Sequence, residues 1–274
     1  MKQLIRRYPI WSFLVINYLI SWTFLYPSYQ LILQSDGIPP LAFIGLIGAY
    51  GPTIAALIVQ AVVDGRKVRE LLRRIIRINA AWQIYALIIL APVILYLSAQ
   101  LLAMYLHGAA VEPQPVSALA GLPFWILAAL PFGPMGEELG WRGFLLPRLL
   151  QRYSLVKSTV LTGLAWGVWH LASFTFPGAA LPEVFAVSPG TILLFVTYTI
   201  SLSFMFTYVH LKGRGSVLLA ILLHAFFNAA SNVTGDFYGD IADPSVRTAY
   251  ILFIVLAGLA GYALLRRSET QHPA

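Results

Sequence analysis

Long apolar stretches separated by short charged connections constrain the fold of this sequence more than any other feature. Eight stretches each hold about 20 or more mostly apolar residues, which is the length that an α-helix needs to cross a membrane. Only 11% of the 274 residues are charged, against about 25% in a soluble domain. We therefore expect an all-α fold, a polytopic transmembrane helical bundle of about eight spans that forms one domain over residues 1–274. The spans are expected at 9–33, 38–63, 80–106, 122–146, 156–176, 188–211, 215–234 and 246–265.

Positive charges are confined to alternate connections between these stretches. The other connections carry acidic residues and a single basic one, Arg247. Cytoplasmic loops are enriched in Lys and Arg, so eight spans with both termini in the cytoplasm satisfy the charge bias at every connection. We call the positively charged set the basic rim: Lys2, Arg6, Arg7, Arg66, Lys67, Arg69, Arg73, Arg74, Arg77, Arg148, Arg152, Lys157, Lys212, Arg214, Arg266 and Arg267. The acidic set is Asp36, Glu112, Glu183, Asp236, Asp240 and Asp243.

The topology also bears on location and partners. We expect an integral protein of the cell membrane, in contact with the lipid bilayer. The net charge of +7 follows from the positive-inside bias, and we therefore exclude a nucleic-acid partner. His210, close to Lys212, is expected at the membrane interface. The sequence carries no signal for the oligomeric state.

The few ionisable residues inside the expected spans are the strongest functional signal. Glu137 and Glu138 are the only acidic residues there, Arg142 follows on the same helix, and His170 and His224 lie in two later spans. A charged side chain in the bilayer costs at least about 2.5–3.5 kcal/mol, so such residues indicate a functional site. At 1.5 Å per helical residue, Glu137, His170 and His224 each lie roughly 15–20 Å from the basic rim. The three spans therefore bring polar groups to one level.

Spacing within each helix sharpens this prediction. Three pairs at i,i+4 spacing can each share a helix face, and the segment Pro131–Gly136, with two prolines and two glycines, predicts a kink just before the glutamates. A purely structural interpretation stays open for Glu138 with Arg142, as a buried ion pair, and for His224 with Asn228, as an interhelical hydrogen-bonding pair. The pairs are Glu138 with Arg142, Trp166 with His170, and His224 with Asn228.

Three motifs on separate helices resemble those of a known family. Residues 137–142 read EELGWR, 166–170 read WGVWH and 224–228 read HAFFN. This set resembles the CPBP family of intramembrane proteases, which includes the CAAX prenyl endopeptidases and the bacterial Abi-type proteins. The family motifs are EExxxR, FxxxH and HxxxN or HxxxD, in this order, and Trp166 stands where the family usually has Phe. The resemblance covers about residues 120–235, which we expect to be the catalytic core.

The resemblance implies an endopeptidase and a role for each motif residue. Glu137 and His170 would activate a water molecule, while His224 and Asn228 would hold the oxyanion. Glu138, Arg142 and Trp166 would be supporting residues. The substrate would be a peptide or a membrane-protein tail, with prenylated CAAX proteins as one option, and the catalytic cavity would face the cytoplasm.

Other functions and mechanisms fit parts of the same pattern. Glu137, His170 and His224 also form a ligand set that is seen in catalytic zinc sites, so Zn²⁺ is an alternative. The HExxH motif is absent, and we favour a glutamate mechanism that requires no cofactor. A proton-coupled transporter could use the two glutamates as a relay, and a non-catalytic membrane scaffold is a third class.

Overall fold

The computed structural model describes residues 1–107, 121–177, 187–238 and 244–271. All regular secondary structure in these ranges is helical, as the sequence predicts. The elements are α1 (Lys2–Arg7), α2 (Pro9–Leu33), η1 (Pro40–Ile44), α3 (Gly45–Ala49), α4 (Gly51–Asp64), η2 (Gly65–Lys67), α5 (Val68–Arg73), η3 (Arg74–Ile76), α6 (Trp82–His107), α7 (Leu122–Ala129), η5 (Leu130–Phe132), α8 (Pro134–Glu138), η6 (Leu139–Leu145), α9 (Leu146–Leu150), α10 (Leu155–Trp169), α11 (Leu171–Thr175), α13 (Pro189–Lys212), α14 (Val217–Tyr238) and α15 (Pro244–Gln271).

Three described helices are long and apolar enough to cross a membrane, which indicates an integral membrane protein. They are Pro9–Leu33, Trp82–Leu106 and Pro189–Lys212, and Pro40–Ala49 with Gly51–Ile76 makes a fourth if this pair, bent by 50°, is one span. The expected spans at 122–146 and 156–176 fall on short or interrupted helices, and of α14 and α15 only the parts Val217–Ala230 and Ile251–Arg266 count as apolar helices. The count of eight spans and the cytoplasmic termini therefore stay predictions.

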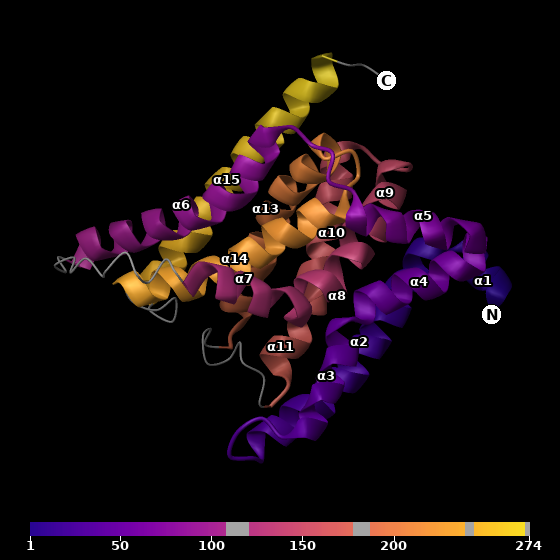
Figure 1. Ribbon diagram of the computed structural model, residues 1–274, viewed down its shortest axis with the longest axis horizontal. Helices are drawn as coiled ribbons and strands as arrows, with labels where there is room; N and C mark the ends of the chain where they lie inside the picture. The colour runs from indigo at the N-terminus through magenta and orange to yellow at the C-terminus, as the bar shows by residue number, and fades with distance from the viewer. Residues whose placement is uncertain (108–120, 178–186, 239–243, 272–274) are drawn as a thin grey trace.

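The helices form a bundle with the glutamate-bearing segment in its middle. In Figure 1, α2 and α4 lie together on one side, α6 and α15 lie together on the other, and α8, α10, α13 and α14 lie between them. Helix α10 packs along α13, and α13 packs along α15. Helix α8 packs against α4 and α14.

The segment that carries the glutamates is broken on both sides. The short 3₁₀ turn η5 ends at Phe132 and Gly133 separates it from α8, so the predicted kink before Glu137 is confirmed. After Glu138 the chain continues as a π-helix, η6, a rare form found mostly at functional sites. Close packing against α3 and α4 fixes this segment: a Cβ atom on Gly136 would lie 2.6 Å from the carbonyl oxygen of Ala49. Only glycine fits there.

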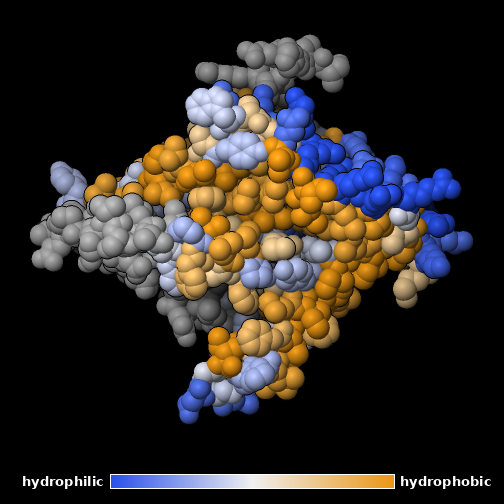
Figure 2. All heavy atoms as spheres, viewed as in Figure 1, coloured by the Kyte–Doolittle hydropathy of each residue, from blue (hydrophilic) through white to orange (hydrophobic). Residues whose placement is uncertain are grey.

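Figure 2 shows a strongly hydrophilic patch on one side of the molecule, over the region where Figure 1 places α1 and α5. Three hydrogen bonds tie some of the basic connections to one another or to the helix ends beside them. These bonds run from Arg6 Nε to the carbonyl of Val62 (2.9 Å), from Arg77 Nη1 to the carbonyl of Arg214 (2.7 Å), and from Arg148 Nη2 to Gln60 Oε1 (2.6 Å). Asp36 lies in the connection between α2 and η1. Glu112, Glu183, Asp240 and Asp243 lie outside the described residues.

Candidate active site

Four predicted site residues from three parts of the chain line one cavity of about 390 Å³, which we call the catalytic cavity. Glu137 comes from α8, His170 from the junction of α10 and α11, and His224 and Asn228 from α14. Glu137 and His224 are only 3% and 5% exposed. The convergence that the sequence predicts from helix depth is therefore present in the structure.

Two indole groups hold one oxygen of the Glu137 carboxylate. Trp166 Nε1 donates to Oε2 at 2.7 Å, and Trp141 Nε1 donates to the same oxygen at 3.3 Å. The other oxygen, Oε1, would lie 3.2 Å from a Cβ atom placed on Gly133, and that Cβ would lie 3.7 Å from Asn228 Nδ2. A side chain at position 133 would therefore crowd Oε1, and Gly133, Glu137 and Asn228 all line the open catalytic cavity.

The hydrogen bond of His170 determines which ring nitrogen is available for chemistry. His170 Nδ1 lies 3.0 Å from the backbone carbonyl of Trp166. Because a carbonyl oxygen can only accept, Nδ1 carries the proton, and in the neutral ring Nε2 presents a lone pair. His170 can therefore accept a hydrogen bond or a proton through Nε2.

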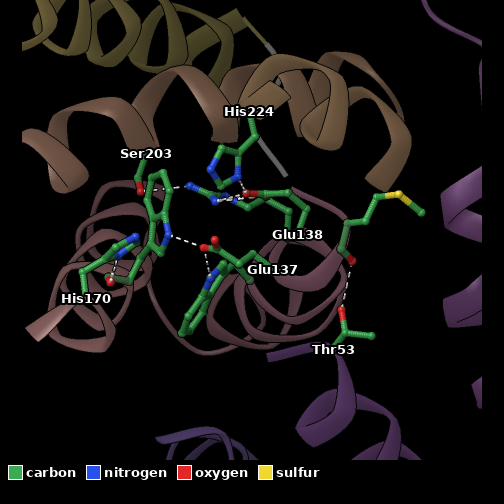
Figure 3. Close-up of polar contacts among 10 residues, drawn as sticks. Thr53, Glu137, Glu138, His170, Ser203 and His224 are labelled. Atoms are coloured by element: carbon green, nitrogen blue, oxygen red, sulfur yellow. Dashed lines mark hydrogen bonds and ion pairs between the residues drawn. The ribbon is translucent and has the colours of Figure 1, made fainter. Parts of the chain in front are cut away.

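Glu138 forms a separate, fully buried charge network on the other side of the segment. Arg142 Nη1 donates to both carboxylate oxygens of Glu138 at 2.9 and 3.0 Å, and Arg142 Nη2 donates to Ser203 Oγ at 3.2 Å. His224 Nδ1 lies 2.9 Å from Glu138 Oε1. Figure 3 shows the two glutamates pointing to different partners, Glu138 to His224 and Glu137 to the indole rings. One carboxylate is thus used for structure, while the other faces the cavity.

Trp166 links these two networks. Besides its hydrogen bond to Glu137, its ring lies 4.6 Å from the Arg142 guanidinium carbon and makes edge contacts with His170 and His224, at centroid distances of 5.8 and 5.4 Å. A phenylalanine at this position keeps a ring but has no N–H group to donate. The departure from the usual motif therefore adds a hydrogen bond to the site.

The structure adds residues that sequence reasoning missed. Trp141 and Ser203 join the site, and the i,i+4 spacing of Glu137 and Trp141 is a signal that could have identified Trp141. His210 is buried, since it is 5% exposed, and its Nδ1 has no hydrogen-bond partner among the described residues. The loop after α13 packs against it, because Gly215 lies close to its ring. The expected place of His210 at the membrane interface stays a prediction.

The donors of the alternative zinc site do not gather around a common point. Within the described parts of the chain, no three His, Cys, Asp or Glu side chains are placed so that they could hold a metal ion. Glu138 and His224 are paired with each other, and Glu137 Oε2 already accepts from two indoles. The side chains as arranged do not fit the metal, so we derive no step through it.

Part of the wall of the catalytic cavity lies toward the end of α2 that is remote from Pro9. This wall includes Ser28 and Ile32 near the end of α2, Ile38 in the following connection, and Phe43 in η1. The cytoplasmic orientation of the cavity stays a prediction.

Comparison with known proteins agrees with the motifs. Residues 119–230 match the family described as type II CAAX prenyl endopeptidase Rce1-like. The match covers fewer than half of the 274 residues, and it shows a similarity to that family over this segment. The matched segment nearly coincides with the 120–235 core that the motifs predict, and it contains all of the predicted site residues.

A relative extends the CPBP match beyond the motifs. The protein named CAAX prenyl protease 2 from Methanococcus maripaludis is 31% identical to this chain over 139 residues. The aligned region covers 51% of this chain and 48% of that relative. The chain thus spans about half the length of the relative that it matches.

The CPBP motif position Trp166 provides a specific test of the indole contact. We expect Trp166→Phe to lower kcat about tenfold or more with little change in KM, because a hydrogen bond to a charged group contributes about 1.5–3 kcal/mol. Trp22→Phe is the matched control, since it removes an indole bond to the carbonyl of Trp169 and not to a carboxylate. Equal peptidase rates for wild type and Trp166→Phe would show that the bond does not position Glu137.

Proposed function

We propose that this chain is an intramembrane endopeptidase that hydrolyses peptide bonds of membrane-associated substrates. The proposal rests on one observation above all. A buried carboxylate with one oxygen held by two indoles lines a cavity together with two imidazoles and an amide. This is the set of groups that general-base hydrolysis of an amide requires. The similarity of residues 119–230 to the type II CAAX prenyl endopeptidase family supports the same reaction.

In the proposed mechanism, Glu137 and His170 activate the attacking water. The water donates one proton to the Glu137 carboxylate and its other hydrogen bond to His170 Nε2, and its oxygen forms a bond to the carbonyl carbon of the substrate. Trp166 and Trp141 keep Glu137 Oε2 occupied, so the proton transfers to Oε1 on the cavity side. When the C–N bond breaks, the protonated Glu137 returns the proton to the leaving amine.

Asn228 and His224 would stabilise the oxyanion that forms during attack. An amide N–H of Asn228 can donate directly. His224 Nδ1 is paired with Glu138, so His224 donates to the oxyanion through Nε2 when the ring is protonated at both nitrogens. A charged imidazole between a carboxylate and a developing oxyanion is stabilised from both sides. Glu138 and Arg142 would therefore act by positioning His224.

The substrate class follows from the membrane setting and from the relatives. The matched relative is named a prenyl protease, and prenylated CAAX-type tails are therefore one group of candidate substrates for this chain. Peptides and tails of other membrane proteins form the second group. Both present an extended, apolar segment at a membrane surface.

The test is incubation of the purified protein, in detergent or vesicles, with internally quenched peptides that include prenylated and unprenylated members. We expect cleavage at internal peptide bonds, identified by mass spectrometry, and retention of most activity after prolonged treatment with a strong chelator. A chelator-treated enzyme that is inactive and regains activity with zinc would contradict the glutamate mechanism. Cleavage of no peptide by the wild type would contradict the proposed function.

A further inference from the structure

A second cavity, of about 410 Å³, is lined by residues of the basic rim, and we call it the rim pocket. Three parts of the chain form its wall: the start of α2, the stretch from α4 to η3, and the stretch from η6 to the residues after α9. None of the four proposed catalytic residues is among the described residues that line it. The rim pocket is therefore separate from the catalytic cavity.

The charges of the rim pocket do not cancel. Four cations and two carboxylates line it, so its net charge is +2. Both carboxylates lie 3.9 Å from a cation of their own stretch, and these pairs are Asp64 with Lys67 and Glu70 with Arg74. The two remaining cations are arginines from α9 and the residues after it. An anion that entered the pocket would be attracted to these two.

Arg148, the first of these arginines, is partly buried and has only neutral partners. Its Nη2 donates to Gln60 Oε1 at 2.6 Å, and its Nη1 donates to the carbonyl of Phe144 at 3.1 Å. In the described part of the chain, no carboxylate lies within ion-pair distance of it. Burial and the charge of Arg74 lower the pKa of Arg148 to about 10. An anion bound between the two guanidinium groups would offset their repulsion.

An apolar groove of about 550 Å³ continues from the rim pocket along the side of the bundle. Ile10 and Arg152 line both the groove and the pocket, so the two spaces adjoin. The groove follows α2 as far as Tyr18 and α10 as far as Val168, away from the charged connections. Among the described residues that line it, Arg152 is the sole charged one.

The groove lies on a surface that is suited to contact with lipid. Helix α2 is long and apolar enough to cross a membrane, and its wall residues Trp11 and Val15 are 68% and 55% exposed. Leu164 on the opposite side of the groove is 40% exposed. Apolar side chains that remain this exposed on a membrane helix face hydrocarbon chains.

A charged pocket that opens into an apolar groove fits a molecule with an anionic head and a long hydrocarbon tail. Arginine binds phosphate oxygens through paired N–H groups, and basic pockets between membrane helices bind phospholipid head groups. We propose that the rim pocket and the groove together bind one anionic phospholipid, with its phosphate at Arg148 and Arg152 and an acyl chain between α2 and α10. A soluble anion would use the pocket alone, and the adjoining groove therefore favours a lipid.

Lipid binding to the purified full-length protein in a neutral detergent tests the proposal. Dioleoyl phosphatidylglycerol is compared with the zwitterionic dioleoyl phosphatidylcholine and with glycerol 3-phosphate, and native mass spectrometry gives the number bound and the Kd. We expect one tightly bound phosphatidylglycerol per chain, with phosphatidylcholine about tenfold weaker or more. Equal affinity for the two lipids would overturn the anion site. Binding of glycerol 3-phosphate as tightly as the lipid would overturn the lipid as occupant.

Arginine variants test the charged half of the site. Arg148→Gln and Arg152→Gln should each weaken phosphatidylglycerol binding about fivefold or more. The Arg152 side chain is exposed and makes no hydrogen bond within the described ranges, so this variant should keep the fold. Arg73→Gln is the matched control, because Arg73 is an exposed rim arginine outside the pocket wall. An equal loss in the control would assign the attraction to the general charge of the rim and overturn the proposed site.

A substitution that fills the groove tests the apolar half. Leu164→Trp should weaken phosphatidylglycerol binding about tenfold and remove most of the rise in melting temperature that the lipid causes. Leu193→Trp is the control, since Leu193 is a 67% exposed leucine on α13 that does not line the groove. Melting temperatures without lipid show whether each variant is folded. Unchanged lipid binding by folded Leu164→Trp would overturn the place of the acyl chain.

Discussion

Glu137→Gln is expected to lower kcat by about 10²–10⁴-fold, the usual contribution of a general base. Glutamine has nearly the same volume as glutamate, and its carbonyl oxygen can still accept from the Trp166 and Trp141 indoles. The change therefore removes the base without removing the contacts that hold the side chain. Rates with an internally quenched peptide and the melting temperature, measured on the same preparation, distinguish loss of catalysis from loss of folding.

The matched control is Glu70→Gln, because Glu70 is an exposed glutamate whose nearest cation, Arg74, lies 3.9 Å away. We expect this variant to keep the activity of the wild type. If Glu137→Gln keeps more than about a tenth of kcat, the loss is too small for a general base. In that case Glu138 is the better candidate for the base.

Arg142→Gln is expected to destabilise the fold by about 3–5 kcal/mol, because it leaves a buried carboxylate without its cation. Arg142 and Glu138 are both 0% exposed and lie 2.9 Å apart. Glu138→Gln should cost a comparable amount, and the double variant should cost less than the sum of the two, since it leaves neither charge unpaired. Equilibrium unfolding of the purified variants in mild detergent measures these differences.

A glutamate-to-glutamine substitution at an exposed ion pair provides the comparison with the buried pair. Glu70→Gln removes the exposed contact with Arg74, and such surface pairs contribute about 0–1 kcal/mol. Additive losses for Glu138→Gln and Arg142→Gln would contradict the interpretation that these two charges stabilise each other. The buried network also holds His224, so we expect the double variant to recover stability without full activity.

The part of the site that could be predicted from the sequence depends on local helix geometry. The pairing of Glu138 with Arg142 follows from i,i+4 spacing, and the break before Glu137 follows from the prolines and glycines of residues 131–136. Both predictions are confirmed. The common level of Glu137, His170 and His224 follows from the helical rise, and all three residues line the catalytic cavity.

Features that depend on packing between helices could not be predicted in the same way. The helical rise gives the depth of Glu137, but the burial of the side chains around it depends on where Trp141 and Phe144 pack. The position of His210 beside Lys212 in the sequence does not reveal that the loop after α13 packs against its ring. The bond from Trp166 Nε1 to Glu137 likewise requires the relative rotation of α8 and α10, which no spacing rule supplies.

The π-helix η6 also affects how this region tolerates changes in chain length. A wide π turn accommodates one more residue than an α-helical turn, so deletion of one residue between Leu139 and Leu145 would convert the wide turn to a regular one and remove that extra residue from between α8 and α9. The wide turn therefore changes the angular offset, counted along the sequence, between the helix face that bears the glutamates and the face that bears Arg148. A helical wheel drawn straight through residues 134–150 assigns the two halves to the wrong faces. Grafts of this segment into other helical proteins need to keep its full seven residues.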